Sequence, residues 1–206
     1  KFFFKKLVPS IFSSGVTQIN ILVGTIIASF QSGAVSYLYY AERVYQINLA
    51  LAGIAVGTVS LPTLSKSIKS KNYLKTFDIQ NKSIQLSLVL SIPASLGLIL
   101  ASEEIVNGLF GYGSFTLGDV ELTARALSFF GYGVVAFALI KILSNFFFAR
   151  DDTKVPFYIS ALIVLLNVSI SLIYFNQIGF LIIPIATSIS TWIGVIIFLY
   201  ILIRKN

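Results

Sequence analysis

The chain has 206 residues, of which 56% are hydrophobic and only 11% charged, and its 15 basic residues outnumber 8 acidic ones, giving a formal net charge of +7. Soluble domains carry about 25% charged residues, so this composition excludes an ordinary soluble protein and predicts a membrane protein with several crossings. The chain contains no cysteine and no histidine, which excludes thiol chemistry, histidine-based triads and the usual zinc sites.

Six apolar segments follow one another along the chain, each long enough to cross a membrane as a helix of roughly 20 residues. Their predicted bounds are residues 7–30, 37–62, 83–101, 122–148, 157–175 and 180–203. The predicted fold class is therefore all-α, a polytopic membrane helix bundle whose six transmembrane helices form one lobe over residues 1–206. The chain lacks methionine and begins KFFFKK, so we expect it to be part of a longer protein.

The first span carries polar and small side chains on one face. Steps of three and four residues place these on one side of a helix: Ser10, Ser13, Thr17, Asn20, Gly24 and Ala28. The second span repeats the arrangement, so two consecutive helices present matching polar fronts. Asn20 is therefore a candidate supporting residue.

The second span holds the most informative residues of the chain. One helical face is expected to hold Tyr39, Arg43, Gln46, Ala50, Gly53, Gly57 and Ser60. The side chains on this face are polar in its first half and small in its second half, whereas those on the other faces are large and apolar. We therefore expect this face to line a cavity that contains Arg43. Glu42, Gln46, Gly53 and Gly57 are the expected supporting residues, and Glu42 is expected to hold Arg43 or Arg125 in place. The two glycines also permit close helix packing, which is common in membrane helices.

Arg43 carries a charge at membrane depth, where an arginine costs roughly 2.5–3.5 kcal/mol on insertion scales. Glu42 does not cancel this charge, because adjacent helical residues point about 100° apart. Each charge therefore needs another partner. Two interpretations stay open: another helix or the headgroups neutralise Arg43, or Arg43 lies in a cavity and meets an anionic ligand.

The connections and the later spans carry the remaining charges. We expect KSIKSKNYLKTFDIQNK to be a solvated loop, and the acidic, glycine-rich SEEIVNGLFGYGSFTLGDVE to hold solvated carboxylates in another. Arg125, near the start of the fourth span, is a weaker candidate for anion binding; its alternatives are capping the outer end of its helix or pairing with Glu42. Lys141 is expected to snorkel or to contact Asn145.

Basic residues gather in alternate connections. The N-terminus, the lysine-rich segment, the turn RDDTKVP and the C-terminus hold twelve of the 15, and the other three connections hold none. Positive charge marks the cytoplasmic side, so both termini are predicted to be cytoplasmic.

The residues indicate no chemistry of bond making or breaking. No phosphate-binding loop, metal-spaced cluster or catalytic constellation occurs, so we expect no enzyme, no cofactor and no nucleic-acid partner. Several spans carry serine, threonine, asparagine and glycine, which is typical both of a water-accessible cavity and of tight helix contacts. The residues alone leave these two alternatives open.

Several motifs occur in an order that resembles a known family. GVTQIN, then YYAERVYQ and LPTLSKS, then LFGYGSF, then KILSNFFFARDDTKVP closely resemble the second half of the MurJ (MviN) lipid II flippases in the MOP exporter superfamily. The resemblance covers nearly the whole chain. It implies that the six spans correspond to the seventh to twelfth helices of a fourteen-helix, two-lobed transporter, with the N-terminal lobe and the last two helices missing here.

The resemblance also implies a function and its residues. The arginine of the family's YYADR block lines the central cavity and is needed for flipping, which implies that Arg43 binds substrate. Glu42 replaces the family's aspartate, and Gly24 stands where many relatives have an acid, so a cation site that uses this carboxylate is not expected. The implied activity is alternating access in the bacterial inner membrane, which carries lipid II, an undecaprenyl-pyrophosphate-linked peptidoglycan precursor, to the outer leaflet. The implied partners are lipid II, membrane lipids and the missing lobe.

Two other functions compete with this one. Another MOP exporter, moving an oligosaccharide lipid or a drug, would share the fold but should lack the YYAER and LPTLS blocks. A membrane scaffold that does not transport would tolerate the loss of Arg43, whereas a flippase would not.

Overall fold

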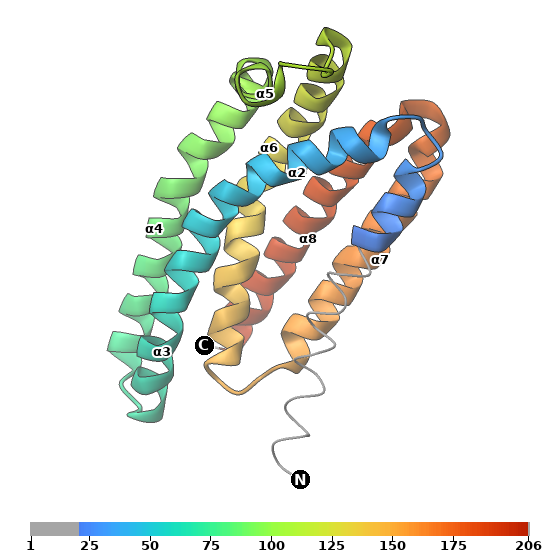
Figure 1. The fold of residues 1–206 in the computed structure, drawn as a ribbon. Helices are drawn as coiled ribbons and strands as arrows, with labels where there is room; N and C mark the ends of the chain where they lie inside the picture. Colours follow the sequence, from blue (N-terminus) through green and yellow to red (C-terminus); the bar gives the residue numbers. More distant parts are fainter. Residues whose placement is uncertain (1–20, 206) are drawn as a thin grey trace.

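The computed structural model describes residues 21–205, and these residues are helical with short turns and no strand. Residues 21–28 are helical and precede these elements: α2 (Ala34–Leu49), the π-helix η1 (Ala50–Ala55), α3 (Val56–Lys69), α4 (Tyr73–Leu100), α5 (Ser102–Phe110), α6 (Leu117–Phe148), α7 (Lys154–Ile178), the 3-10 turn η2 (Gly179–Leu181) and α8 (Ile182–Lys205). The long helices run up and down a bundle (Figure 1). The all-α prediction is confirmed.

Four continuous segments of the described chain are long and apolar enough to span a membrane: Ala34–Lys69, Tyr73–Leu100, Leu117–Phe148 and Lys154–Arg204. The last segment holds two antiparallel helices, α7 and α8, which η2 joins (Figure 1). The predicted second to sixth spans therefore each match a described helix or helical segment. The first predicted span lies mostly outside the described residues.

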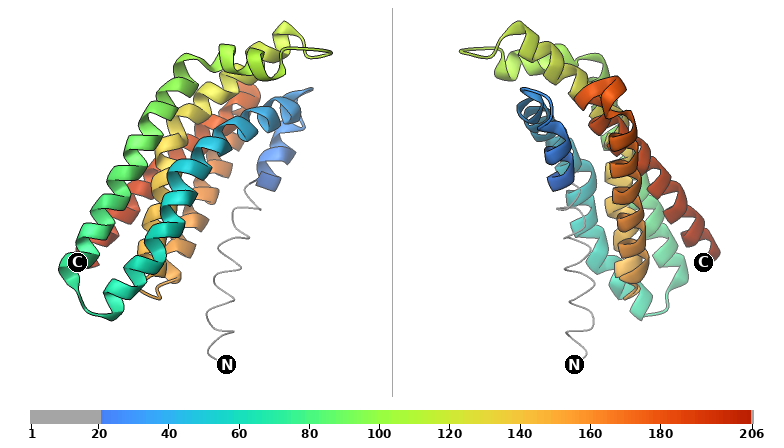
Figure 2. Two further views of the ribbon diagram at one scale, coloured as in Figure 1. Left: turned by 60° about the vertical axis from the view of Figure 1, so that its left-hand side comes forward. Right: turned by 90° about the vertical axis from the view of Figure 1, so that its right-hand side faces the viewer.

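Helix α6 is the centre of the bundle. In its apolar stretch of 18 residues, 67% of the residues are buried inside the structure. Figures 1 and 2 show α6 between α4 and the α2–α3 rod on one side and α8 on the other. Its buried side chains form two apolar clusters, one above the other along the helix. Phe130 belongs to the cluster nearer α5, and Phe146 and Phe147 to the one nearer the α3–α4 turn.

A stripe of small polar residues joins α4 to α6. The buried residues of α4 are mostly hydroxyl-bearing: Thr76, Gln80, Ser83, Ser87, Ser91, Ser95 and Leu98. Small residues such as these let the backbones of two helices approach closely. The opposite, apolar face of α4 is then left to face the lipid. The Ser95 hydroxyl donates a hydrogen bond of 2.7 Å to the carbonyl oxygen of Gly131. The sequence analysis did not predict this stripe, although its residues recur at steps of three and four, the spacing of one helical face.

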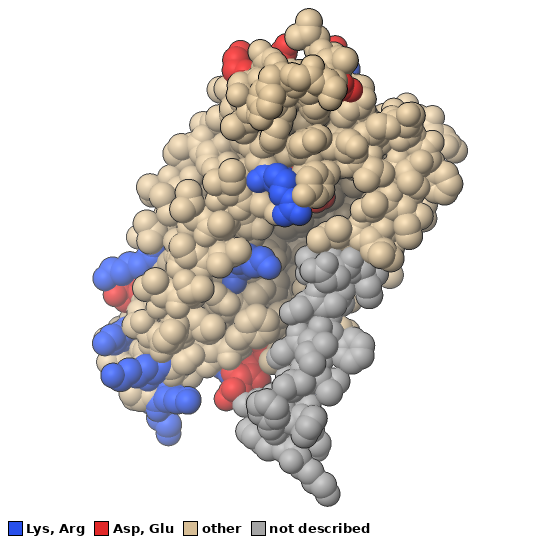
Figure 3. Space-filling view, viewed as in Figure 1, with Lys and Arg blue, Asp and Glu red and all other residues tan. Residues whose placement is uncertain are grey.

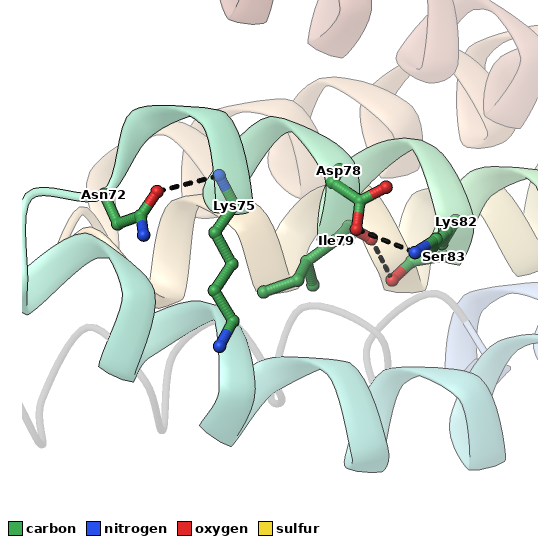
Figure 4. Close-up of polar contacts among 6 residues, drawn as sticks. All are labelled: Asn72, Lys75, Asp78, Ile79, Lys82 and Ser83. Carbon is green, nitrogen blue, oxygen red and sulfur yellow. Dashed lines mark hydrogen bonds and ion pairs between the residues drawn. The ribbon is translucent and has the colours of Figure 1, made fainter.

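The predicted solvated loop between the second and third spans is wrong. Helix α3 continues to Lys69 and α4 begins at Tyr73, so the connection is a three-residue turn. Lys71 adopts a positive φ of 53° there, and the Asn72 side chain caps α4 by accepting a hydrogen bond of 3.0 Å from the backbone N–H of Lys75 (Figure 4). Lysines are good helix formers, so the charged run continues both helices past the apolar spans.

Replacing Asn72 by alanine should destabilise the α3–α4 turn. The lost cap leaves an N–H of the first turn without its acceptor, which costs about 1 kcal/mol. Asn81→Ala is the matched control, because Asn81 is exposed within α4. Thermal unfolding in detergent should show a lower midpoint for Asn72→Ala alone. Equal midpoints for the two variants would contradict a stabilising cap.

The acidic connection is not a simple loop either. Glu103 and Glu104 lie in the first turn of α5, where the helix dipole favours negative charge. Helix α5 lies across the end of α4 (Figures 1 and 2). Phe110 from α5 and Phe115 pack on Tyr40 of α2, with ring centroids 4.8 and 5.4 Å away. The acidic end of the bundle is therefore capped by packed structure.

Candidate functional site

The predicted face of the second span divides into two halves in the structure. Tyr39, Arg43 and Ala50 are exposed, whereas Gly53 and Gly57 are buried. The division falls at the π-helix η1. A π-helical turn contains about one more residue than an α-helical turn, so the residues after it point in a different direction around the helix axis. A face predicted with a constant α-helical period therefore does not stay on one side of the helix here. The expected face is therefore not uniform: its first half is exposed, and its second half packs on α6 beside a small pocket.

Arg43 lies on the exposed half of this face. Basic side chains occur midway along the bundle as well as at its lower end (Figure 3). Its Nη1 donates a hydrogen bond of 3.3 Å to Oε1 of Gln46. Its guanidinium carbon lies 4.7 Å from the ring centroid of Tyr39, in cation–π geometry. Gln46, one of the expected supporting residues, thus contacts Arg43.

No acid forms an ion pair with Arg43 within the part of the chain that the structure describes, although the adjacent Glu42 interacts with it electrostatically. Residues 1–20 contain no Asp or Glu either. Gln46 and Tyr39 hold the guanidinium without cancelling its charge. Its planar fork suits a bidentate contact with a phosphate.

Glu42 does not have the partners expected from the sequence. Its side chain is half-buried, and it forms no ion pair with any basic residue among residues 21–205. Arg125 instead pairs with Glu121 at 2.6 Å, one turn earlier on the same helix. A carboxylate four residues before an arginine lies on the same helical face, so this local pairing replaces the longer-range one. The predicted pairing of Glu42 with Arg125 is therefore absent, and Glu42 forms no ion pair with Arg43 either, although these two adjacent side chains interact electrostatically.

Arg125 does not share a pocket with Arg43. It lines a pocket of about 790 Å³ at the acidic end of the bundle, together with Glu103, Asn107 and Glu121. The side chains of Arg125 and Glu121 are 60% and 57% exposed, so their pair contributes little to stability. None of the lining residues comes from α2.

Gly53 and Gly57 bring α3 and η1 close to α6. A Cβ on Gly53 would lie 3.2 Å from the Cα of Ala138, and one on Gly57 would lie 2.5 Å from Nδ2 of Asn145. Close packing, one of the two roles expected for these glycines, is therefore present. A small pocket of about 190 Å³ remains beside them, and Lys141 is one of its lining residues.

The other residues predicted for the site have different positions. Asn20 lies outside the described residues. Gly24 packs against α8, since a Cβ there would lie 3.6 Å from Cγ2 of Ile183. Among residues 21–205, no group of three or more Asp, Glu, His or Cys side chains is arranged to hold a metal ion.

The comparisons with known proteins agree on one family. A sequence model of the family described as "Lipid II flippase MurJ" matches residues 1–206. The chain is 38% identical over 199 residues to a probable lipid II flippase MurJ of Rhizobium tropici, covering 97% of this chain and 37% of that protein. It is 39% identical over 184 residues to the corresponding protein of Rickettsia prowazekii, covering 89% of this chain and 36% of that protein.

Solved structures show the same fold. A lipid II flippase MurJ in an inward closed conformation superposes with a TM-score of 0.86 at 30% identity, covering 95% of this chain and 41% of that one. An outward-facing MATE family multidrug resistance transporter of the MOP superfamily gives a TM-score of 0.81 at 19% identity, covering 96% and 44%. The second match supports the fold alone. In each comparison the chain spans less than half the length of the protein it matches.

Proposed function

The chain belongs to the MurJ family of lipid II flippases, and from this membership we propose that residues 1–206 form one lobe of a transporter that moves lipid II across the bacterial inner membrane. The observation that carries the proposal is Arg43, an exposed guanidinium at membrane depth that forms no ion pair with any described acid. A charge in this position is costly unless it meets water or an anionic ligand. The pyrophosphate of lipid II supplies such a ligand.

In the proposed mechanism Arg43 binds the pyrophosphate while the polyprenyl tail stays in lipid. Tyr39 and Gln46 hold the guanidinium from both sides along α2, which orients its fork without cancelling its charge. The lobe then rocks against a second lobe, so that the cavity opens first to the cytoplasm and then to the periplasm. Glu42 does not bind the substrate, because a carboxylate would repel a pyrophosphate.

The proposed orientation places both termini of this segment in the cytoplasm. Basic side chains gather, with a few acidic ones, at the end of the bundle that holds the α3–α4 turn, whereas the charged side chains at the α5 end are mostly acidic (Figure 3). An excess of Lys and Arg marks the cytoplasmic side of membrane proteins.

Cysteines placed at Lys71 and Ser114 should react with membrane-impermeant reagents from opposite sides. Lys71 lies in the α3–α4 turn and Ser114 in the turn between α5 and α6, and the chain has no other cysteine. Ser114 should be labelled in intact cells after removal of the outer membrane barrier, and Lys71 only after the inner membrane is opened. Labelling of both positions from the periplasm would overturn the proposed orientation.

Complementation tests the proposed function directly. A chimera in which residues 1–206 replace the matching segment of a full-length MurJ relative should rescue a cell depleted of its own lipid II flippase. Purified chimera should also move lipid II across vesicle membranes. Rescue without transport would favour a scaffold, and transport of an oligosaccharide lipid or drug in place of lipid II would favour another MOP exporter.

A further inference from the structure

The only described lysine within the bundle, away from its basic end, is Lys141, on α6. It is exposed, although most of its neighbours on this central helix are buried. It lines the 190 Å³ pocket beside Gly53 and Gly57, and the other lining residues are uncharged: Gly53, Ile54, Gly57, Thr58, Leu61 and Asn145. Lys141 therefore faces open space between η1–α3 and α6.

Lys141 has no acidic partner. Within residues 21–205 it forms no ion pair, and residues 1–20 contain no Asp or Glu. Lys141 and Asn145 line the same pocket, and the Asn145 amide lies against Gly57. Like Arg43, Lys141 thus forms no ion pair with a described acid.

Snorkelling does not account for Lys141. The nearer end of α6 is its C-terminus at Phe148, seven residues away. Side chains of an α-helix lean toward the helix N-terminus, which for Lys141 is the direction away from that nearer end. A lysine that reached for the nearer headgroups would have to turn back against this tilt.

The pocket places Lys141 well separated from Arg43. Lys141 lies beside Gly53 and Gly57, ten and fourteen residues after Arg43 along one helical rod, which corresponds to about 15 Å or more at 1.5 Å per residue. The α2–α3 rod and α6 run in the same direction (Figure 1). Both side chains therefore lean the same way, and the separation between their charges is kept.

We infer that Lys141 is a second anion contact of the substrate cavity and binds a carboxylate of the head group's peptide, while Arg43 binds the pyrophosphate. The inference rests on the proposed function. The two phosphoryl groups of a pyrophosphate share one bridging oxygen, so a single pyrophosphate is too short for two cations this far apart. The peptide part of lipid II carries free carboxylates, and the sugar that bears the peptide separates them from the pyrophosphate. The cavity thus selects a lipid with two separated anionic groups.

Binding measured with three lipids tests the inference in the purified chimera. The probes are lipid II, lipid II with its peptide carboxylates amidated, and undecaprenyl pyrophosphate. Lys141→Gln should weaken binding of lipid II by roughly tenfold, as expected for loss of one hydrogen bond between charged groups, and leave undecaprenyl pyrophosphate unaffected. Lys141→Arg should bind lipid II like the unaltered chimera. Amidated lipid II should bind the unaltered chimera as weakly as lipid II binds Lys141→Gln.

The controls separate this inference from the proposed function. Lys69→Gln removes the same charge from the exposed basic end and should change none of the three affinities. Arg43→Gln should weaken all three lipids. Equal weakening of lipid II and undecaprenyl pyrophosphate by Lys141→Gln would place Lys141 at the pyrophosphate and overturn the inference, as would no weakening at all. Failure of the unaltered chimera to bind lipid II would overturn the proposed function itself.

Discussion

Replacing Arg43 by alanine in the chimera should abolish rescue of a flippase-depleted cell while leaving the amount of folded protein in the membrane unchanged. The side chain is exposed, and both its hydrogen bond and its cation–π contact are with residues of its own helix, Gln46 and Tyr39, so its removal breaks no contact between helices that these interactions make. Its loss removes charge-assisted hydrogen bonds to the pyrophosphate, each worth about 1.5–3 kcal/mol, or roughly tenfold or more in binding.

Arg43→Lys should also be impaired, though less than the alanine variant. The ammonium keeps the charge but loses the planar fork and with it the second hydrogen bond to a phosphate. Transport of lipid II into vesicles should therefore fall in the order arginine, lysine, alanine.

The matched control for Arg43 is Arg204. Its guanidinium also lies 4.7 Å from a tyrosine ring, that of Tyr200, but at the end of α8. Arg204→Ala should keep full transport. Arg43 variants that are folded, abundant and fully active would refute the ligand role, and activity that falls only in proportion to protein abundance would assign Arg43 a structural one.

Replacing Gly131 by leucine should prevent α4 from packing on α6. A Cβ at this position would lie 2.9 Å from Cγ1 of Ile99 and 3.3 Å from its backbone nitrogen. Backbone cannot move aside as a flexible side chain can, and the hydrogen bond from Ser95 to the Gly131 carbonyl would be strained as well. Overpacking of this kind costs about 1–3 kcal/mol or more, so the variant should show a much lower yield and unfolding temperature.

Gly97→Leu is the control for this change. Gly97 lies on the same helix pair, on α4, but a Cβ there would meet no atom within 4 Å. Both substitutions raise helix propensity to a similar degree, so the difference between the two variants isolates packing. If Gly131→Leu unfolds at the same temperature as Gly97→Leu in detergent, the close approach of α4 and α6 does not stabilise the bundle.

The sequence alone was sufficient for the class of protein and for the positions of its second to sixth apolar spans. Hydropathy and charge are local properties: a run of about 20 apolar residues must satisfy its own backbone hydrogen bonds in lipid, and a helix does so within one segment. The contact of Arg43 with Gln46 could also be predicted, since residues three apart on a helix are neighbours. The family resemblance could also be recognised from the sequence, because motifs such as YYAER are short local patterns.

The tertiary structure decided which surfaces are buried and which charges have partners. At a constant helical period, the residues from Tyr39 to Ser60 that share a face form one continuous stripe. In the structure, the π-helix η1 and the packing of Gly53 and Gly57 on α6 divide this stripe into an exposed part and a buried part. Arg125 takes Glu121 as its partner, and Lys141 lines a pocket with none. Burial and pairing depend on side chains from other helices, whose positions along and around one another no local pattern specifies.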